Sequence, residues 1–156
     1  MNKVLFVCVH NSGRSQMAEA LFNCYAAGVA QAFSTGTQPA SYVNRTVADA
    51  MREVGIDLSS QGPKLLAPKM LENAEKVVTM GCGVEGVCAA AFVPTEEWKL
   101  EDPEGKPIEK VRKIRDEIAV RAKKLIEEIQ QQGGRDYGQA LSSASIILAM
   151  EIKGKC

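Results

Sequence analysis

The sequence predicts one α/β domain, a three-layer sandwich with a small parallel sheet between helices. Short β-branched and aromatic runs alternate with helical stretches along the chain. Such alternation implies parallel strands joined by right-handed crossovers, which place helices on both faces of the sheet. The length of 156 residues, with 46% hydrophobic and 24% charged residues, suits one well-cored domain rather than two.

Charge and hydropathy exclude several classes of protein. Lys+Arg and Asp+Glu both number 19, so the chain has no overall basic field, and we expect no nucleic-acid partner. No stretch approaches the roughly 18 apolar residues that span a bilayer, so we expect no membrane partner. The opening apolar run, Val4–Val9, is shorter than the core of a signal peptide. We therefore expect a cytoplasmic protein.

The first half of the chain contains two strand-and-helix units. Lys3–Val7 is a β-branched and aromatic run that predicts a strand, and Ser15–Ala27 follows it with apolar residues at helical spacing. A second strand is predicted at Ala32–Thr35. An amphipathic helix is predicted at Arg45–Val54.

The second half adds two strands and a long helix. We expect a loop over Ser59–Pro68, a third strand at Lys76–Met80 and a short fourth strand at Trp98–Leu100. The helix predicted at Ile108–Gln131 combines one apolar stripe with oppositely charged pairs at i,i+4 spacing. Its charges are expected to form a solvated face.

The loop Cys8–Ser15 (CVHNSGRS) carries the most informative motif, a cysteine and an arginine separated by five residues. Ligands of open parallel sheets bind at the carboxyl ends of the strands, where this loop lies. Backbone N–H groups wrapped around a helix N-terminus suit a tetrahedral dianion, and an arginine adds a bidentate grip. The same positive potential favours a thiolate at Cys8, to which Ser15 can donate a hydrogen bond. The predicted oxyanion-binding residues are Val9, His10, Asn11, Ser12, Gly13 and Arg14.

The alternative interpretation of this motif is purely structural: Cys8 is a buried thiol at the end of a strand, and Arg14 is a surface charge. The position of the motif between a strand and a helix favours the oxyanion site. Asp102 follows as a candidate general acid, because a carboxylic acid held over the anion can protonate a departing oxygen. Asp102-Pro103 is also good turn chemistry, and the two interpretations are compatible.

Cys82 and Cys88 form a second cluster of thiols after the third predicted strand. The five residues between them are rich in glycine, which leaves the linker flexible enough to close a disulfide. Ordinary buried cysteines are one alternative and a metal site is another. Zinc needs about four close ligands, and His10 is the only histidine in the sequence. We therefore expect no metal at these cysteines.

Several motifs together resemble the arsenate reductases built on the low-molecular-weight protein-tyrosine-phosphatase fold. They occur in the family's order and at similar spacing: Cys8–Ser15, Ser34–Gly36, Gly55–Ser59, Val77–Cys82, Trp98–Pro103 and Arg115–Ile118. The resemblance implies a four-stranded parallel sheet and a domain spanning residues 1–131. Residues 132–156 have no counterpart in the compact form of the family and are left as a C-terminal extension of unknown role.

The resemblance also implies a mechanism. Cys8 adds to arsenate, Cys82 attacks the Cys8 sulfur to release arsenite, and Cys88 then attacks Cys82 to pass the disulfide outward. Thioredoxin or a similar dithiol reductant resets the enzyme. No cofactor is required for these steps.

Some relatives bind a structural potassium ion beside the loop. Asn11, Glu19 and Ser34 match its ligands, whereas Lys64 stands where an acidic ligand is expected. This departure puts a bound potassium ion near Asn11 in doubt.

Two other functions stay open at this point. The first is a low-molecular-weight phosphatase acting on phosphomonoesters or phosphotyrosine, in which Cys82 and Cys88 regulate the nucleophile by reversible oxidation. Glu104 and Gly105 follow Asp102-Pro103 where such phosphatases carry tyrosines, and this disfavours a phosphotyrosine substrate. The second is a non-catalytic oxyanion or redox sensor, which would not need Asp102.

Overall fold

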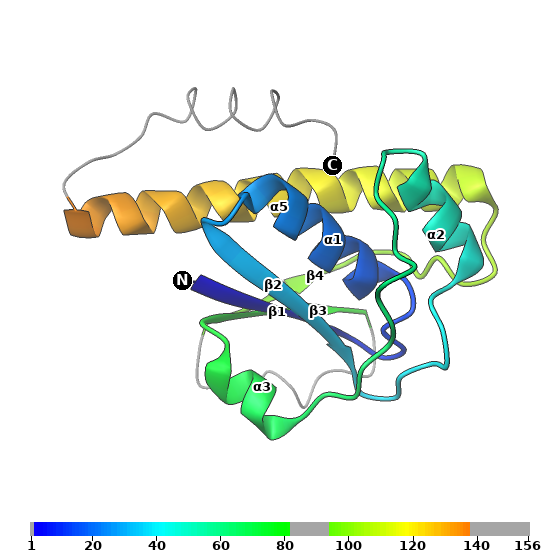
Figure 1. Cartoon of the computed structure of the whole chain (residues 1–156), viewed down its shortest axis with the longest axis horizontal. Helices are drawn as coiled ribbons and strands as arrows, with labels where there is room; N and C mark the ends of the chain where they lie inside the picture. Colours follow the sequence, from blue (N-terminus) through cyan, green and yellow to red (C-terminus); the bar gives the residue numbers. More distant parts are fainter. Residues whose placement is uncertain (1, 82–93, 138–156) are drawn as a thin grey trace.

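The computed structural model describes residues 2–81 and 94–137 (Figure 1). Within them the strands form a four-stranded, fully parallel sheet in the order β2-β1-β3-β4. The strands are β1 (Asn2–Cys8), β2 (Ala30–Gly36), β3 (Lys76–Met80) and β4 (Thr95–Trp98). The predicted fold class, a parallel sheet flanked by helices, is confirmed.

The helices are α1 (Arg14–Ala26), α2 (Arg45–Arg52), α3 (Pro68–Asn73) and α5 (Ile108–Tyr137). Figure 1 shows α1, α2 and α5 on one side of the sheet and α3 on the other. Helix α2 begins where the side chain of Asn44 accepts a hydrogen bond from the N–H of Val47 at 3.2 Å. Helix α1 ends at Ala27, whose left-handed conformation stops the helix.

The larger core lies between the sheet and helices α1 and α5. Its centre is aromatic: Phe6 of β1 packs against Phe22 of α1 and Trp98 of β4, with ring centroids 5.9 and 5.3 Å apart. Burial of a large apolar side chain contributes about 1.5–3 kcal/mol, so this face anchors α1 firmly on β1. The loop that joins them is therefore held at both ends.

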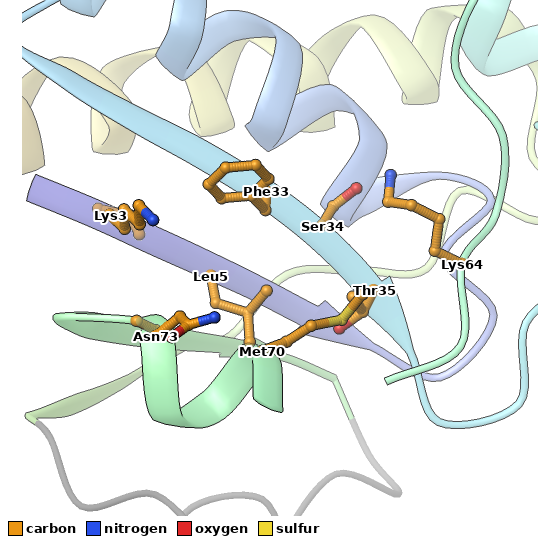
Figure 2. Close-up of a pocket in the computed structure, with 10 residues that line it drawn as sticks. Lys3, Leu5, Phe33, Ser34, Thr35, Lys64, Met70 and Asn73 are labelled. Atoms are coloured by element: carbon orange, nitrogen blue, oxygen red, sulfur yellow. The ribbon is translucent and has the colours of Figure 1, made fainter. Parts of the chain in front are cut away.

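The face of the sheet toward α3 has a smaller core. It contains Leu5, Val7, Ala74 and Val77. A mostly apolar cavity of about 250 Å³ remains between β1, β2 and α3 (Figure 2). Cys8 and Arg14 do not line this cavity, so it is separate from the oxyanion loop.

Three elements differ from the sequence prediction by more than two residues or were not predicted at all. Strand β4 ends at Trp98 rather than spanning Trp98–Leu100, because the carbonyl of Leu100 accepts a hydrogen bond from Arg14 instead of pairing in the sheet. Helix α3 was not predicted, and it has no fully buried residue that would mark it in the sequence. Helix α5 continues beyond residue 131 to Tyr137.

Within the described part of the chain, no helix is both long and apolar enough to cross a bilayer.

Candidate active site

Cys8 is the last residue of β1, and Arg14 is the first residue of α1. The five residues between them therefore form a loop at the carboxyl end of a central strand, in front of a helix N-terminus. Helix N-termini expose N–H groups that lack partners within the helix, and the helix dipole adds positive potential there. The fold thus supplies an anion-binding position before any side chain is considered.

The loop turns its carbonyl groups outward. N–H groups of residues 37–44 donate to the carbonyl oxygens of Cys8, Val9, His10 and Ser12 at 2.8–3.2 Å. In a trans peptide unit the C=O and the next N–H point in opposite directions, and the described residues contain no cis peptide bond. The N–H groups of residues 9, 10, 11 and 13 therefore point away from the 37–44 segment and into the loop.

The sulfur of Cys8 lies inside this loop, and the Cys8 residue is only 3% exposed. It receives a hydrogen bond from the backbone N–H of Asn11 at 3.1 Å, and the hydroxyl of Ser15 lies 2.8 Å away. The side-chain N–H of Asn11 donates to the same Ser15 oxygen at 2.7 Å, which leaves the hydroxyl proton free to point at the sulfur. One backbone donor and one side-chain hydroxyl thus lie within hydrogen-bond distance of the same sulfur.

Asn11 is the scaffold of the loop. It has a φ of 50°, a left-handed conformation that asparagine tolerates better than most residues, and it is fully buried. Its side-chain oxygen accepts hydrogen bonds from the N–H of Lys64 at 2.9 Å and from the Gln16 amide at 3.2 Å. Three hydrogen bonds, two accepted by the side-chain oxygen and one donated to Ser15, thus hold the Asn11 side chain within the protein.

Arg14 connects the loop to the segment after β4. Its guanidinium donates to the carbonyl of Leu100 at 3.1 Å and lies 3.7 Å from a carboxylate oxygen of Asp102. Gly81 packs directly against the guanidinium with a φ of 91°. A Cβ at this position would collide with Arg14, so the close approach requires glycine.

Asp102 lies above the loop, with its side chain 51% exposed. One of its oxygens accepts the N–H of Glu104 at 3.0 Å, so the predicted turn is present, while the other oxygen faces Arg14. Pro103 packs on Gly13, where an added Cβ would come within 2.7 Å of the proline ring. This contact fixes the Asp-Pro segment over the loop.

The remaining predicted residues are placed as follows. His10 is exposed, and its ring nitrogen lies 3.1 Å from the carbonyl of Gln38, so its side chain does not face the sulfur. Ser12 is half-buried in the loop. Cys82 and Cys88 lie outside the described residues. Among residues 2–81 and 94–137, no group of three or more His, Cys, Asp or Glu side chains is arranged to hold a metal ion.

Sequence reasoning missed two glutamines behind the loop. Gln16 is fully buried and donates to the backbone carbonyls of Asn11 and Gly62 at 3.0 and 3.1 Å. Gln61 donates to the side-chain oxygen of Gln16 at 2.9 Å. A polar residue at a core position of α1 is the one signal in the sequence that marks Gln16.

A buried thiol in a loop at a helix N-terminus, an arginine at the end of the same loop and a carboxylate above it form an arrangement typical of proteins that bind a tetrahedral oxyanion and attack it with sulfur. Residues 3–135 match the family described as low molecular weight phosphotyrosine protein phosphatase. A glutaredoxin arsenate reductase of Synechocystis is 38% identical over 134 residues, which cover 83% of this chain and 99% of that protein.

Solved structures agree with this match. An arsenate reductase in the phosphate-binding state superposes with a TM-score of 0.74 at 33% identity, covering 83% of this chain and 99% of that one. A thioredoxin-dependent arsenate reductase of Corynebacterium glutamicum superposes with a TM-score of 0.70 at 34% identity, covering 83% and 62%. The chain belongs to the low molecular weight phosphotyrosine protein phosphatase family and, within it, to the arsenate reductases.

Proposed function

We propose that the protein reduces arsenate to arsenite through a covalent adduct on Cys8. The observation that carries the proposal is the position of the Cys8 sulfur, which lies inside a loop of converging N–H donors and beside the Ser15 hydroxyl. Relatives that share 33–38% of their residues with this chain are named as arsenate reductases. The substrate is therefore a tetrahedral oxyanion, with arsenate as the reacting one.

In the first step the Cys8 thiolate attacks arsenic and forms a sulfur–arsenic bond. The N–H groups of the loop and the Arg14 guanidinium neutralise the charge on the arsenate oxygens. One oxygen departs as water, and Asp102 is the group placed to supply its proton. Its exposed position and its 3.7 Å distance to Arg14 put the carboxyl at the mouth of the loop.

In the second step two electrons pass from thiols to arsenic. The Cys82 thiolate attacks the Cys8 sulfur, the sulfur–arsenic bond breaks, and arsenic leaves with the bonding pair as arsenite. Cys88 then attacks Cys82, which releases the Cys8 thiolate and leaves a Cys82–Cys88 disulfide. The Cys8 thiolate leaves readily from such an exchange, because the donors around it stabilise the anion.

An external dithiol reductant, thioredoxin or a protein of the same chemistry, reduces the Cys82–Cys88 disulfide. The named relatives include one thioredoxin-dependent and one glutaredoxin enzyme, so a thiol reductant is common to both. A reducing compartment such as the cytoplasm suits this cycle.

A phosphomonoester phosphatase is the second candidate, because the same thiol, arginine and carboxylic acid can cleave a phosphate ester. In that case Cys82 and Cys88 would act as a redox switch on Cys8. The family name supports this chemistry. Glu104 and Gly105, both exposed, follow Pro103 and offer no aromatic wall for a phosphotyrosine ring.

Steady-state assays separate the two functions. Purified protein is supplied with arsenate, thioredoxin, thioredoxin reductase and NADPH, and NADPH oxidation is followed alongside arsenite production. We expect arsenate-dependent oxidation that Cys8→Ser abolishes. The same assay is repeated with a glutaredoxin system in place of thioredoxin. The phosphatase would be favoured if the protein hydrolyses p-nitrophenyl phosphate but neither system shows arsenate-dependent NADPH oxidation.

A further inference from the structure

Behind the oxyanion loop lies a largely buried carboxylate, Glu19 on α1, whose side chain is 13% exposed. One of its oxygens accepts hydrogen bonds from the Ser34 hydroxyl at 2.7 Å and the Gln61 amide at 2.8 Å. The ammonium of Lys64 lies 3.7 Å from the same oxygen. Figure 2 shows the Lys64 side chain reaching toward Ser34 at the edge of β2. Two neutral donors and one cation thus converge on a single buried oxygen.

This carboxylate is linked to the reacting sulfur by a continuous series of hydrogen bonds. Gln61 bridges Glu19 and Gln16, and Gln16 donates to both oxygens of Asn11 at 3.0 and 3.2 Å. Asn11 in turn holds Ser15, which touches Cys8. The position of Glu19 therefore affects the orientation of the two donors on the sulfur.

Residue 64 enters the same network through its backbone. Its N–H donates to the side-chain oxygen of Asn11 at 2.9 Å, and its carbonyl accepts the N–H of Gly36 at 2.8 Å. The segment that delivers the ammonium to Glu19 thus also clamps the scaffold residue of the loop. Lys64 therefore contacts Glu19 through its charged side chain and Asn11 through its backbone.

The potassium site of some relatives does not fit these side chains. The Asn11 side-chain oxygen already accepts two hydrogen bonds, and the bonded Glu19 oxygen has three donors around it. A potassium ion at Glu19 would also lie next to the Lys64 ammonium and be repelled by it. The site around Glu19 has room for one cation, and the Lys64 ammonium is that cation.

We propose that Lys64 is a positioning residue whose ammonium serves as the cation of this site, so that the Asn11–Ser15 support of Cys8 is independent of potassium in solution. Because Lys64 itself neutralises Glu19, loss of the ammonium frees a place that a small monovalent cation can fill. The proposal rests on the proposed function for its effect on turnover. Its effect on Cys8 and on stability does not depend on which oxyanion the protein turns over.

The test compares the wild type with Lys64→Asp, which places a second carboxylate at Glu19, and with Lys64→Gln, which only removes the charge. Each protein is measured in potassium chloride and in choline chloride at equal ionic strength. Three quantities are followed: the melting temperature, the rate of Cys8 alkylation against pH by peptide mass spectrometry, and kcat and KM for arsenate. Lys69→Asp is the matched control, an exposed lysine on α3.

We expect the wild type to behave alike in both salts. Lys64→Gln in choline should lose about two- to fivefold in Cys8 alkylation rate and in kcat, because the ion pair is partly exposed and screened. Lys64→Asp in choline should lose more of the Cys8 alkylation rate and of kcat, and potassium chloride should restore most of both. Lys64→Arg should recover independence of potassium, and Lys69→Asp should respond to neither salt.

Potassium-specific activation of the wild type would overturn the proposal, since the chain would then depend on a bound ion. Lys64→Gln that matches the wild type in choline would also overturn it. If Lys64→Asp does not fold, the Lys64→Gln comparison decides alone. A protein that fails to reduce arsenate while Lys64→Gln still alters Cys8 alkylation would contradict the proposed function and leave this inference standing.

Discussion

The hydroxyl oxygen of Ser15, the second residue of α1, lies 2.8 Å from the sulfur of Cys8, the last residue of β1. Because the Asn11 amide already donates to this hydroxyl, the hydroxyl proton is free to be donated to the sulfur. The strand, the loop and the first turn of the helix thus supply the groups that surround this one sulfur.

Ser15→Ala should slow the reaction of Cys8 with iodoacetamide at pH 7 by about tenfold or more, since a hydrogen bond to a charged group is worth roughly 1.5–3 kcal/mol. The rate is followed on the Cys8 peptide by mass spectrometry over a range of pH. Ser59→Ala, an exposed serine away from the loop, is the control. Equal rates for Ser15→Ala and wild type would remove the serine from thiolate stabilisation.

Arg14→Lys should weaken phosphate and arsenate binding by roughly ten- to hundredfold, because the ammonium cannot make the paired, planar contacts of a guanidinium. The affinity is measured as protection of Cys8 from alkylation by added phosphate. Arg52→Lys, on the exposed surface of α2, should bind as the wild type does. Retention of affinity in Arg14→Lys would mean that the backbone N–H groups alone hold the anion.

Asp102→Asn should lower kcat for arsenate by about 10²-fold or more while changing the affinity for phosphate little, because a general acid acts only in the chemical step. Asp49→Asn on α2 is a matched exposed control. Nearly full activity in Asp102→Asn would mean that Asp102 has only a structural role in the turn, where it accepts a hydrogen bond from the N–H of Glu104.

Glu53 at the end of α2 ties that helix to α5. Arg112 donates to it at 2.6–3.1 Å, and Arg115 donates at 3.1 Å. The hydrogen bonds from Arg112, followed by those from Arg115, hold the pKa of Glu53 below its ordinary value. A carboxyl with a lowered folded-state pKa stabilises the protein above its ordinary pKa, and this contribution disappears as the pH falls through the lowered value.

Glu53→Gln should therefore lower the melting temperature at pH 7 by a few degrees, and the difference from wild type should shrink as the pH falls below the ordinary glutamate pKa of about 4.5. Thermal melts between pH 3 and 7 measure the effect. Glu72→Gln on α3 provides an exposed control. A destabilisation of equal size at both pH values would show that the charge of Glu53 is not its source.

The loop could be predicted because its chemistry is contiguous. Cys8, Arg14 and Ser15 lie within eight residues of sequence, and the strand and helix on either side are marked by ordinary periodicity. The same holds for the parallel sheet, since its two central strands, β1 and β3, are largely apolar runs. Local sequence patterns were sufficient wherever a single strand, loop or helix determines the position of a side chain.

The supports of the loop could not be predicted in this way. Gln61 and Lys64 act on residues 42–53 positions earlier in the chain, from a coil without periodicity. Strand β4 was misplaced for a related reason. Its residues Thr95, Glu96 and Glu97 are polar, and its place at the sheet edge leaves Trp98 as its one fully buried residue. Tertiary contacts, rather than local pattern, decide such positions.

The relay of Cys82 and Cys88 is the central chemical claim, and a single-turnover experiment tests it most directly. Reduced wild type, Cys82→Ser and Cys88→Ser are mixed with arsenate without any external reductant, and arsenite and disulfides are measured by mass spectrometry. The account predicts that Cys88→Ser releases one arsenite and stops with Cys8 joined to Cys82, whereas Cys82→Ser releases none. In a parallel assay supplied with thioredoxin, thioredoxin reductase and NADPH, sustained turnover of arsenate by Cys82→Ser would contradict the relay, because an external thiol would then attack the Cys8 adduct directly.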